Sequence, residues 1–144
     1  MHNPVVIVGS FNQDLTWDCA EFPRPGETIF GSFRTGPGGK GSNQAVAAAR
    51  TGVGTTFVGG IGKDVFGEGV KRFYDAEGIR HELIEFEDIP TGNAGIFVSE
   101  DGENEIIVAL GANLGFKSAD IRADTLERAE IVICQNEIDL GTTL

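Results

Sequence analysis

The sequence has 144 residues, of which 40% are hydrophobic, enough for the core of one domain. Its 22 acidic and 11 basic residues give a formal net charge of −11. This charge argues against nucleic acid and anionic membranes as partners, because both are bound through basic surfaces.

The first predicted element is a buried strand over residues 5–8, a continuous apolar run that Gly9 ends. Turn residues follow, and then the alternating stretch 28–34 predicts a strand with one solvated face, outside the main sheet. Residues 41–51 are rich in alanine and predict a helix, which Gly52 ends.

A second buried strand is predicted over residues 55–58, followed by a helix over residues 64–77. Asp64 is the expected N-cap of this helix, and Gly78 lies just past its end. Its apolar side chains recur at helical spacing, and we expect them all in the core: Val65, Phe66, Val70 and Phe73.

The last third of the chain begins with a weaker strand over residues 81–86. A hairpin follows over residues 95–109, with an Asp-Gly turn at its tip. We then expect a helix over residues 118–129 with Ser118 as its N-cap, and a fully buried strand over residues 131–134.

This order of elements predicts an α/β fold with three layers, a Rossmann-like parallel sheet between helices. The two antiparallel excursions, 28–34 and 95–109, would form a small accessory sheet. Only ten residues follow the apolar strand at residues 131–134, so we expect another strand or a partner to cover it. The chain therefore resembles the first part of a larger fold.

A glycine-rich loop, Gly36-Pro37-Gly38-Gly39-Lys40-Gly41, runs directly into the predicted helix. Glycines allow close approach of a ligand, and a helix N-terminus offers free N–H groups, so the loop suits an oxygen-rich ligand. It also matches the G-x-G-x-x-G pattern, which leaves a nicotinamide dinucleotide enzyme as an alternative. However, that pattern belongs directly after the first strand. A P-loop is excluded because Gly41, not Ser or Thr, follows Lys40.

Polar residues follow the predicted strands at their carboxyl ends, where open parallel sheets bind ligands. They are Asn12 and Asp14 after the first strand and Glu137 after the last, with Lys40 and Asn43 at the helix start. Ordinary turn chemistry or helix capping by Glu137 or Asp139 is the structural alternative. The convergence of these residues favours a polyol site. The only histidines, His2 and His81, form no metal-ligand pattern.

The residues Gly38-Gly39-Lys40-Gly41-Ser42-Asn43-Gln44-Ala45 resemble the N-terminal signature of the ribokinase-like (PfkB-type) carbohydrate kinases. Further similar segments are Gly9-Ser10-Phe11-Asn12-Gln13-Asp14, Gly59-Gly60-Ile61-Gly62, Thr91-Gly92-Asn93-Ala94, Gly111-Ala112-Asn113 and Gln135-Asn136-Glu137. The Gly-Gly-Lys version, followed by Asn-Gln-Ala, resembles ribokinases more than fructokinases or adenosine kinases.

The resemblance implies a Rossmann-like domain half over residues 1–144, with a β lid formed by excursions at about residues 12–35 and 94–110. It implies a sugar pocket lined by Asn12, Asp14, Gly38, Gly39, Lys40, Asn43 and Glu137. The implied activity is transfer of the γ-phosphoryl group of ATP to ribose or a similar pentose. The implied cofactors are ATP, Mg²⁺ and a monovalent cation, and the implied partner is a second copy, bound through the lid strands.

The Gly-Ala-Gly-Asp motif of this family, whose aspartate is the general base, does not occur in these 144 residues. The resemblance therefore implies that this chain holds the sugar-binding half and has no catalytic residue, ATP site or cation site. A non-catalytic sugar-binding or dimerisation module is the alternative. Two widely separated cysteines, Cys19 and Cys134, and a start without a basic segment indicate a cytoplasmic protein with reduced thiols.

Overall fold

The main sheet is parallel, as the sequence predicts. The computed structural model describes residues 3–144, and His2 lies outside the described residues. The strand order is β5 (Arg80–Phe86), β4 (Thr55–Gly62), β1 (Asn3–Val8) and β8 (Ala129–Cys134). All three neighbouring pairs are parallel, so the carboxyl ends of the strands share one edge.

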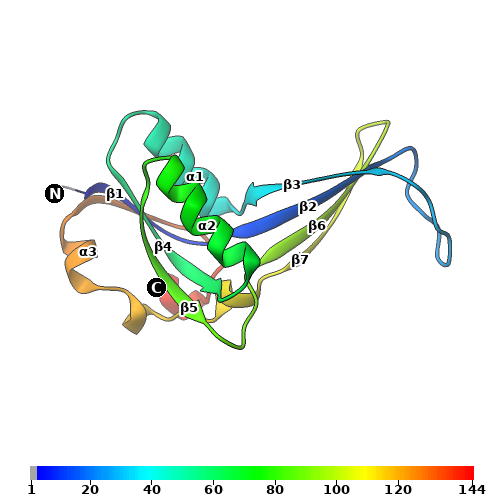
Figure 1. Ribbon diagram of the computed structural model, residues 1–144. Coiled ribbons are helices and arrows are strands. Elements are labelled where there is room, and N and C mark those ends of the chain that lie inside the picture. Colours follow the sequence, from blue (N-terminus) through cyan, green and yellow to red (C-terminus); the bar gives the residue numbers. More distant parts are fainter. Residues whose placement is uncertain (1–2) are drawn as a thin grey trace.

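Helices cover both faces of the main sheet (Figure 1). On one face lie α1 (Lys40–Arg50) and α2 (Val65–Ala76). The other face carries α3 (Ala123–Glu127) and three short helices: η1 (Gly111–Leu114), η2 (Ser118–Asp120) and α4 (Leu140–Thr143). The three-layer α/β fold is confirmed. Among residues 3–144, no helix combines the length and apolar character needed to cross a bilayer.

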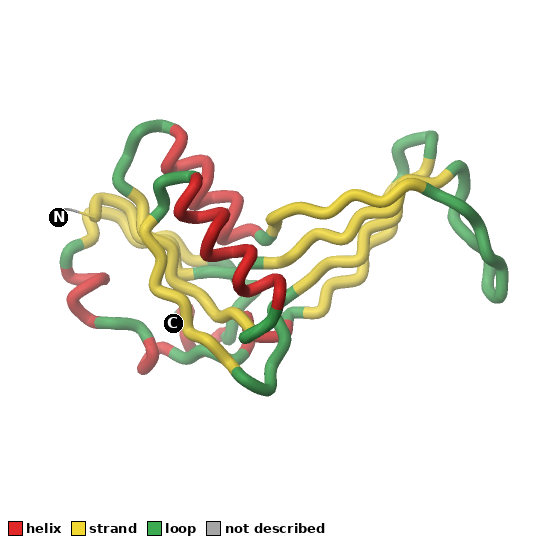
Figure 2. The backbone as a smooth tube through the Cα atoms, in the orientation of Figure 1, coloured by secondary structure: helices red, strands yellow, loops and turns green. Residues whose placement is uncertain are grey.

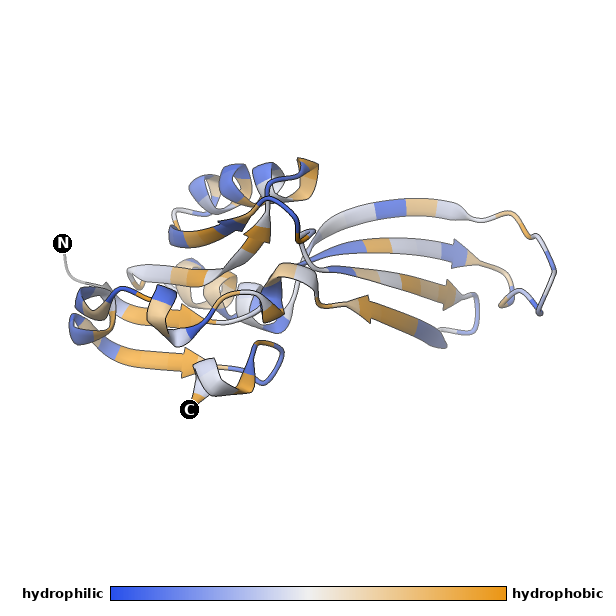
Figure 3. Ribbon diagram, turned by 90° about the horizontal axis from the view of Figure 1, so that it is seen from below, coloured by the Kyte–Doolittle hydropathy of each residue, from blue (hydrophilic) through white to orange (hydrophobic). Residues whose placement is uncertain are grey.

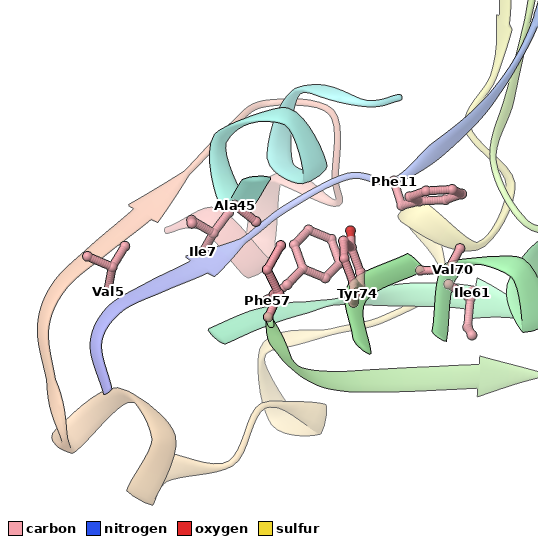
Figure 4. Close-up of a cluster of buried hydrophobic side chains, with 9 residues drawn as sticks. Val5, Ile7, Phe11, Ala45, Phe57, Ile61, Val70 and Tyr74 are labelled. Atoms are coloured by element: carbon pink, nitrogen blue, oxygen red, sulfur yellow. The ribbon is translucent and has the colours of Figure 1, made fainter. Parts of the chain in front are cut away.

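The apolar run in β1 is buried on both faces because successive side chains of a strand point to opposite sides. Ile7 joins a cluster with Phe57 and Tyr74 beneath α1 and α2 (Figure 4). Val6 and Val8 join a second cluster on the other face, with Val58, Phe116 and Ile138. The strand is thus the centre of the fold.

Helix α2 begins at its predicted N-cap: the Asp64 carboxylate accepts a hydrogen bond from the N–H of Gly67 at 2.8 Å. Gly78, just past the end of the helix, has a φ of +68°, a conformation that glycine adopts without strain. The prediction of Val65 as a core residue is wrong, because this first residue of the helix is 75% exposed. Tyr74 is fully buried instead.

A second sheet projects from the main sheet and is called the arm sheet here (Figure 2). Its strand order is β3 (Ser32–Gly38), β2 (Asn12–Cys19), β6 (Asn93–Ser99) and β7 (Asn104–Ala109). The expected accessory sheet is present, but it is mixed rather than antiparallel throughout, because β2 and β6 pair in parallel while the other two pairs are antiparallel. Between β2 and β6 the chain passes through the main sheet, and it therefore enters the arm sheet a second time in the same direction.

The strand expected at residues 28–34 lies at Ser32–Gly38 instead, and β2 was not predicted. Strand β2 carries polar side chains at alternate positions from Asn12 to Asp18, and this composition is also typical of a turn. Their pairing with β6 and β3 on either side makes them a strand. Pro37 is tolerated because β3 is an edge strand.

The helix expected over residues 118–129 is not continuous, because the structure divides it into η2 and α3. Ser118 is not an N-cap; η2 begins after Lys117, whose N–H donates to the Asp120 carboxylate at 2.7 Å. Extended backbone at Ile121 and Arg122 then separates η2 from α3. Strand β8 is also not buried: Ile131 is 55% exposed because β8 forms an edge of the main sheet.

Candidate functional site

The predicted site residues meet where the two sheets join. Strand β1 ends at Val8, and four residues later the chain enters β2 at Asn12. Strand β3 ends at Gly38 and leads through Gly39 into α1. The register places Asn12 opposite Gly38, so the glycine loop lies against the start of β2.

Glycine is required in the loop because the backbones are in close contact. Gly39 has a φ of +92°, and a Cβ atom there would lie 2.7 Å from the Asn12 nitrogen. A Cβ atom at Gly41 would lie 2.7 Å from the nitrogen of Ser10. The loop is therefore fixed against the chain that leaves β1, and its helix begins beside that chain.

Lys40 and Glu137 form an ion pair at this junction. The hydroxyl of Ser10 donates a hydrogen bond to the other oxygen of Glu137 at 2.8 Å. Burial favours the neutral form of Glu137, but hydrogen bonds from Lys40 and Ser10 and the Lys40 charge outweigh it and lower the pKa of this carboxyl. Glu137 is thus held ionised and offers acceptor oxygens.

Asp14 lies on β2 with its carboxylate packed against Gly38, where a Cβ atom would lie 2.3 Å from Oδ2. Burial raises the pKa of Asp14, and the nearby charge of Arg34 only partly offsets this. No hydrogen bond from residues 3–144 reaches the carboxylate. It borders a cavity of about 260 Å³ that is also lined by Thr16, Arg34 and Ile96. A half-buried carboxylate without a donor is suited to a ligand that brings hydroxyl groups.

The two predicted asparagines differ in their surroundings. Asn12 is only 4% exposed, and its Oδ1 accepts a hydrogen bond from Asn113 Nδ2 at 3.0 Å. Asn43 lies in the first turn of α1 with an exposed side chain, and the structure gives that side chain no contact with the other predicted residues. Neither Asn12 nor Asp14 lies in a turn, so the structural alternative for them is wrong.

Residues that the sequence reasoning left without a role complete the junction. Ser10 contacts Glu137 across 127 residues of sequence, and Asn113 contacts Asn12 across 101. A polar residue directly after a buried strand is the signal that could have identified Ser10. Asn113 is discernible only through the family resemblance, because nothing local in its segment indicates a contact with β2.

The larger cavity, of about 510 Å³, is elsewhere and is lined by Thr56, Asp75, His81 and neighbouring residues. It lies where β4 and β5 begin, at the opposite end of the sheet from the carboxyl ends. Ligands of open parallel sheets bind at the carboxyl ends, so we place the site at the junction, beside the smaller cavity that Asp14 borders on the arm sheet.

The junction does not fit a nucleotide or a metal ion. The charge of Lys40 is already paired with Glu137, and the carboxylate of Asp14 would repel phosphate groups. The G-x-G-x-x-G segment follows β3 of the arm sheet rather than β1. Among residues 3–144, no three His, Cys, Asp or Glu side chains are grouped to hold a metal ion. A neutral polyol fits this mixture of acceptors and donors better.

Residues 3–139 match the model of the pfkB family carbohydrate kinases. The chain is 40% identical over 144 residues to the ribokinase of Mus musculus, covering 97% of this chain and 45% of the relative. It is 38% identical over 138 residues to the ribokinase of Bacillus subtilis, covering 93% and 47%. The chain thus spans about half the length of the curated relatives it matches.

Solved structures lead to the same family as the sequence comparisons. The ribokinase of Giardia lamblia superposes with a TM-score of 0.94 at 41% identity, covering 98% of this chain and 47% of that one. The Arabidopsis thaliana ribokinase complexed with ribose and ATP has a TM-score of 0.84 at 36% identity, covering 96% and 46%. The resemblance stated from the sequence is confirmed: this chain belongs to the pfkB family of carbohydrate kinases.

Proposed function

We propose that this chain forms the sugar-binding part of a kinase that transfers the γ-phosphoryl group of ATP to ribose or a similar pentose. The observation that carries the proposal is the half-buried carboxylate of Asp14, which receives no hydrogen bond from residues 3–144 and borders a cavity. The similarity to ribokinases, one of them complexed with ribose and ATP, supports ribose as the sugar.

The sugar would be held by complementary hydrogen bonds. Asp14 and Glu137 would accept from its hydroxyl groups, while Asn12, Lys40 and Asn43 would donate to its oxygens. Gly38 and Gly39 would let the sugar approach the backbone closely. A site built in this way rejects analogues that lack a hydroxyl, because its own polar groups are then left unpaired.

The ATP site, its Mg²⁺ and monovalent cation, and the general base would lie outside this chain. The ion pair of Lys40 with Glu137 and the exposed edge strand β8 support this division. The chain alone would then bind the sugar without phosphorylating it. We place the protein in the cytoplasm, where its free thiols, Cys19 and Cys134, would stay reduced.

The test is a pair of measurements on the purified chain. Ribose should raise the free energy of unfolding by about 2.7 kcal/mol at a concentration of 100 times its Kd, measured by denaturation with and without the sugar. ATP and ribose together should give no product above the blank. Absence of any ribose effect would contradict the sugar site, and turnover at about 1–100 s⁻¹ would contradict the division of the active site.

We also propose that two copies associate through the arm sheet, on the face that carries Asp14. Residues 20–31 cover part of the opposite face, where Pro23, Thr28 and Ile29 line a cavity with Trp17 and Phe97, and they leave Ile107 on that face 72% exposed. The Asp14 face carries Ile96 and Ile106 side by side in register, and Ile106 is 52% exposed. Figure 3 shows the apolar segments along these strands. An uncovered apolar strip of this kind suits contact with a second copy.

Replacing Ile106 with aspartate should convert the proposed dimer into a monomer, because it places a charge within this apolar strip. The matched control is Ile107→Asp, one residue further along β7, whose side chain points to the opposite face. Sedimentation equilibrium should show loss of the dimer for Ile106→Asp alone. A monomeric wild-type chain, or equal loss in both variants, would contradict the proposed interface.

A further inference from the structure

Asn113 forms a completely buried link between the two sheets. It lies in η1, directly after β7, and its side chain has no exposed surface. The N–H of Phe11 donates to Asn113 Oδ1 at 3.0 Å. Asn113 Nδ2 donates in turn to the carbonyl of Phe11 at 2.8 Å and to Asn12 Oδ1 at 3.0 Å.

These contacts admit only one orientation of the Asn113 amide. A backbone N–H can only donate, so the atom facing Phe11 N must be the oxygen of Asn113. The other end is therefore the NH₂ group, and both of its hydrogens are used. Its partner on Asn12 must then be an acceptor, which is Oδ1.

As a consequence, the side-chain oxygen of Asn12 is occupied by its hydrogen bond from Asn113, and the NH₂ group of Asn12 is left to donate to another partner. Asn12 and Asp14 are two residues apart on β2, so their side chains emerge on the same face of the arm sheet. One presents a donor and the other an acceptor, which is the complement of a sugar carrying neighbouring hydroxyl groups.

We propose that Asn113 is a positioning residue, which holds the Asn12 amide so that its NH₂ group donates to an oxygen of the bound sugar. This inference rests on the proposed function and adds the direction of one hydrogen bond to it. In this arrangement Asn113 does not touch the sugar and acts through Asn12.

Gly92 supports this role of Asn113, because its backbone packs directly against the side chains of Asn12 and Asn113. A Cβ atom at Gly92 would lie 2.2 Å from Asn113 Nδ2 and 2.4 Å from Asn12 Oδ1. The N–H of Gln13 donates to the Gly92 carbonyl at 2.8 Å, which fixes this segment over the amides. Gly92 thus shields the side chains of Asn12 and Asn113 from water. If either amide turned over, its buried polar groups would lose their hydrogen-bond partners.

Two variants separate positioning from general stability. Asn12→Asp keeps an oxygen for Asn113 and removes the donor. Asn113→Asp keeps the acceptor for Phe11 N–H but cannot donate, so Asn12 should rotate and turn its oxygen toward the sugar. The control is Asn93→Asp at the same junction, which loses a hydrogen bond to the Thr91 carbonyl and has no contact with Asn12.

The first readout is sugar affinity by calorimetry, with ribose and each of its single-deoxy analogues. Asn12→Asp and Asn113→Asp should bind ribose about tenfold more weakly, while Asn93→Asp should not. One deoxy analogue should bind the wild type and both variants equally, because it lacks the hydroxyl that Asn12 contacts. Uniform weakening for every sugar, or full ribose affinity of Asn12→Asp, would overturn the proposal.

The second readout needs no sugar. Side-chain amide exchange by NMR should be slow for Asn113 and fast for Asn12 in the wild type, and Asn113 should stay protected in Asn12→Asp. Slow exchange of Asn12 with fast exchange of Asn113 would overturn the orientation. If the wild type fails to bind ribose, the proposed function fails and the role of Asn113 in sugar binding fails with it. The exchange rates still decide the orientation.

Discussion

Replacing Asp14 with alanine should abolish the ribose-dependent stabilisation of the chain. The carboxylate borders a cavity on the arm sheet, close to the junction, and receives no hydrogen bond from residues 3–144. Two hydrogen bonds from sugar hydroxyls to this charged group would contribute about 3 kcal/mol or more, so the Kd for ribose should rise about 100-fold. Calorimetric titration or denaturation with ribose measures the loss.

The control is Asp124→Ala, in α3 and outside the lining of this cavity. The Asp124 carboxylate pairs with Arg122 at 2.9 Å, a type of surface pair that contributes little to stability. Ribose affinity should therefore change by less than about twofold in this variant. Unchanged binding in Asp14→Ala would show that the sugar site lies elsewhere.

The same carboxylate should reduce the stability of the sugar-free chain. Burial raises the pKa of Asp14 above its value in the unfolded chain. The stability linked to this group is therefore present below the unfolded pKa and is lost as the pH rises through the folded pKa. Asp14→Asn should accordingly be more stable than the wild type at pH 7, and this advantage should vanish at pH 3. A site that binds a ligand at the expense of stability behaves in this way.

The sequence predicted best those parts of the fold in which local pattern and burial coincide. The apolar run of β1 and the helical spacing and N-cap of α2 are set by residues close together in the chain. Strand β2 was not predicted because its polar residues become a strand through pairing with β3 and with β6, and β6 lies some 80 residues later. The exposure of Ile131 in β8 also depends on which strand lies beside it.

For the candidate site, too, the sequence predicted the features that depend on neighbouring residues but not those that depend on strand pairing. The glycine loop, Lys40 and Glu137 could be singled out from their positions after predicted strands, and the structure pairs the two side chains. The packing of the Asp14 carboxylate against Gly38 follows from the register of β2 and β3. A one-residue shift in register would move Asp14 to the other face, and residue pattern alone does not fix that register.

Replacing Gly39 with alanine should cost about 3 kcal/mol or more of the free energy of unfolding. Two effects add: the φ of +92° is unfavourable for a residue with a side chain, at about 1–2 kcal/mol. The new Cβ atom would also lie 2.7 Å from Asn12 N and 2.9 Å from both Phe11 Cα and Ser10 O. These are backbone atoms that cannot rotate away, so the start of β2 must shift.

Gly52→Ala separates the two effects. Gly52 has a φ of +87°, but an added Cβ atom there meets nothing within 4 Å. Its substitution should cost only the backbone strain, about 1–2 kcal/mol. Denaturant unfolding of both variants gives the difference directly. Equal losses would mean that the glycine loop moves freely against β2 and that Gly39 serves only the turn. A larger loss in Gly39→Ala would mean that the loop holds the start of β2, and with it Asn12 and Asp14, in place.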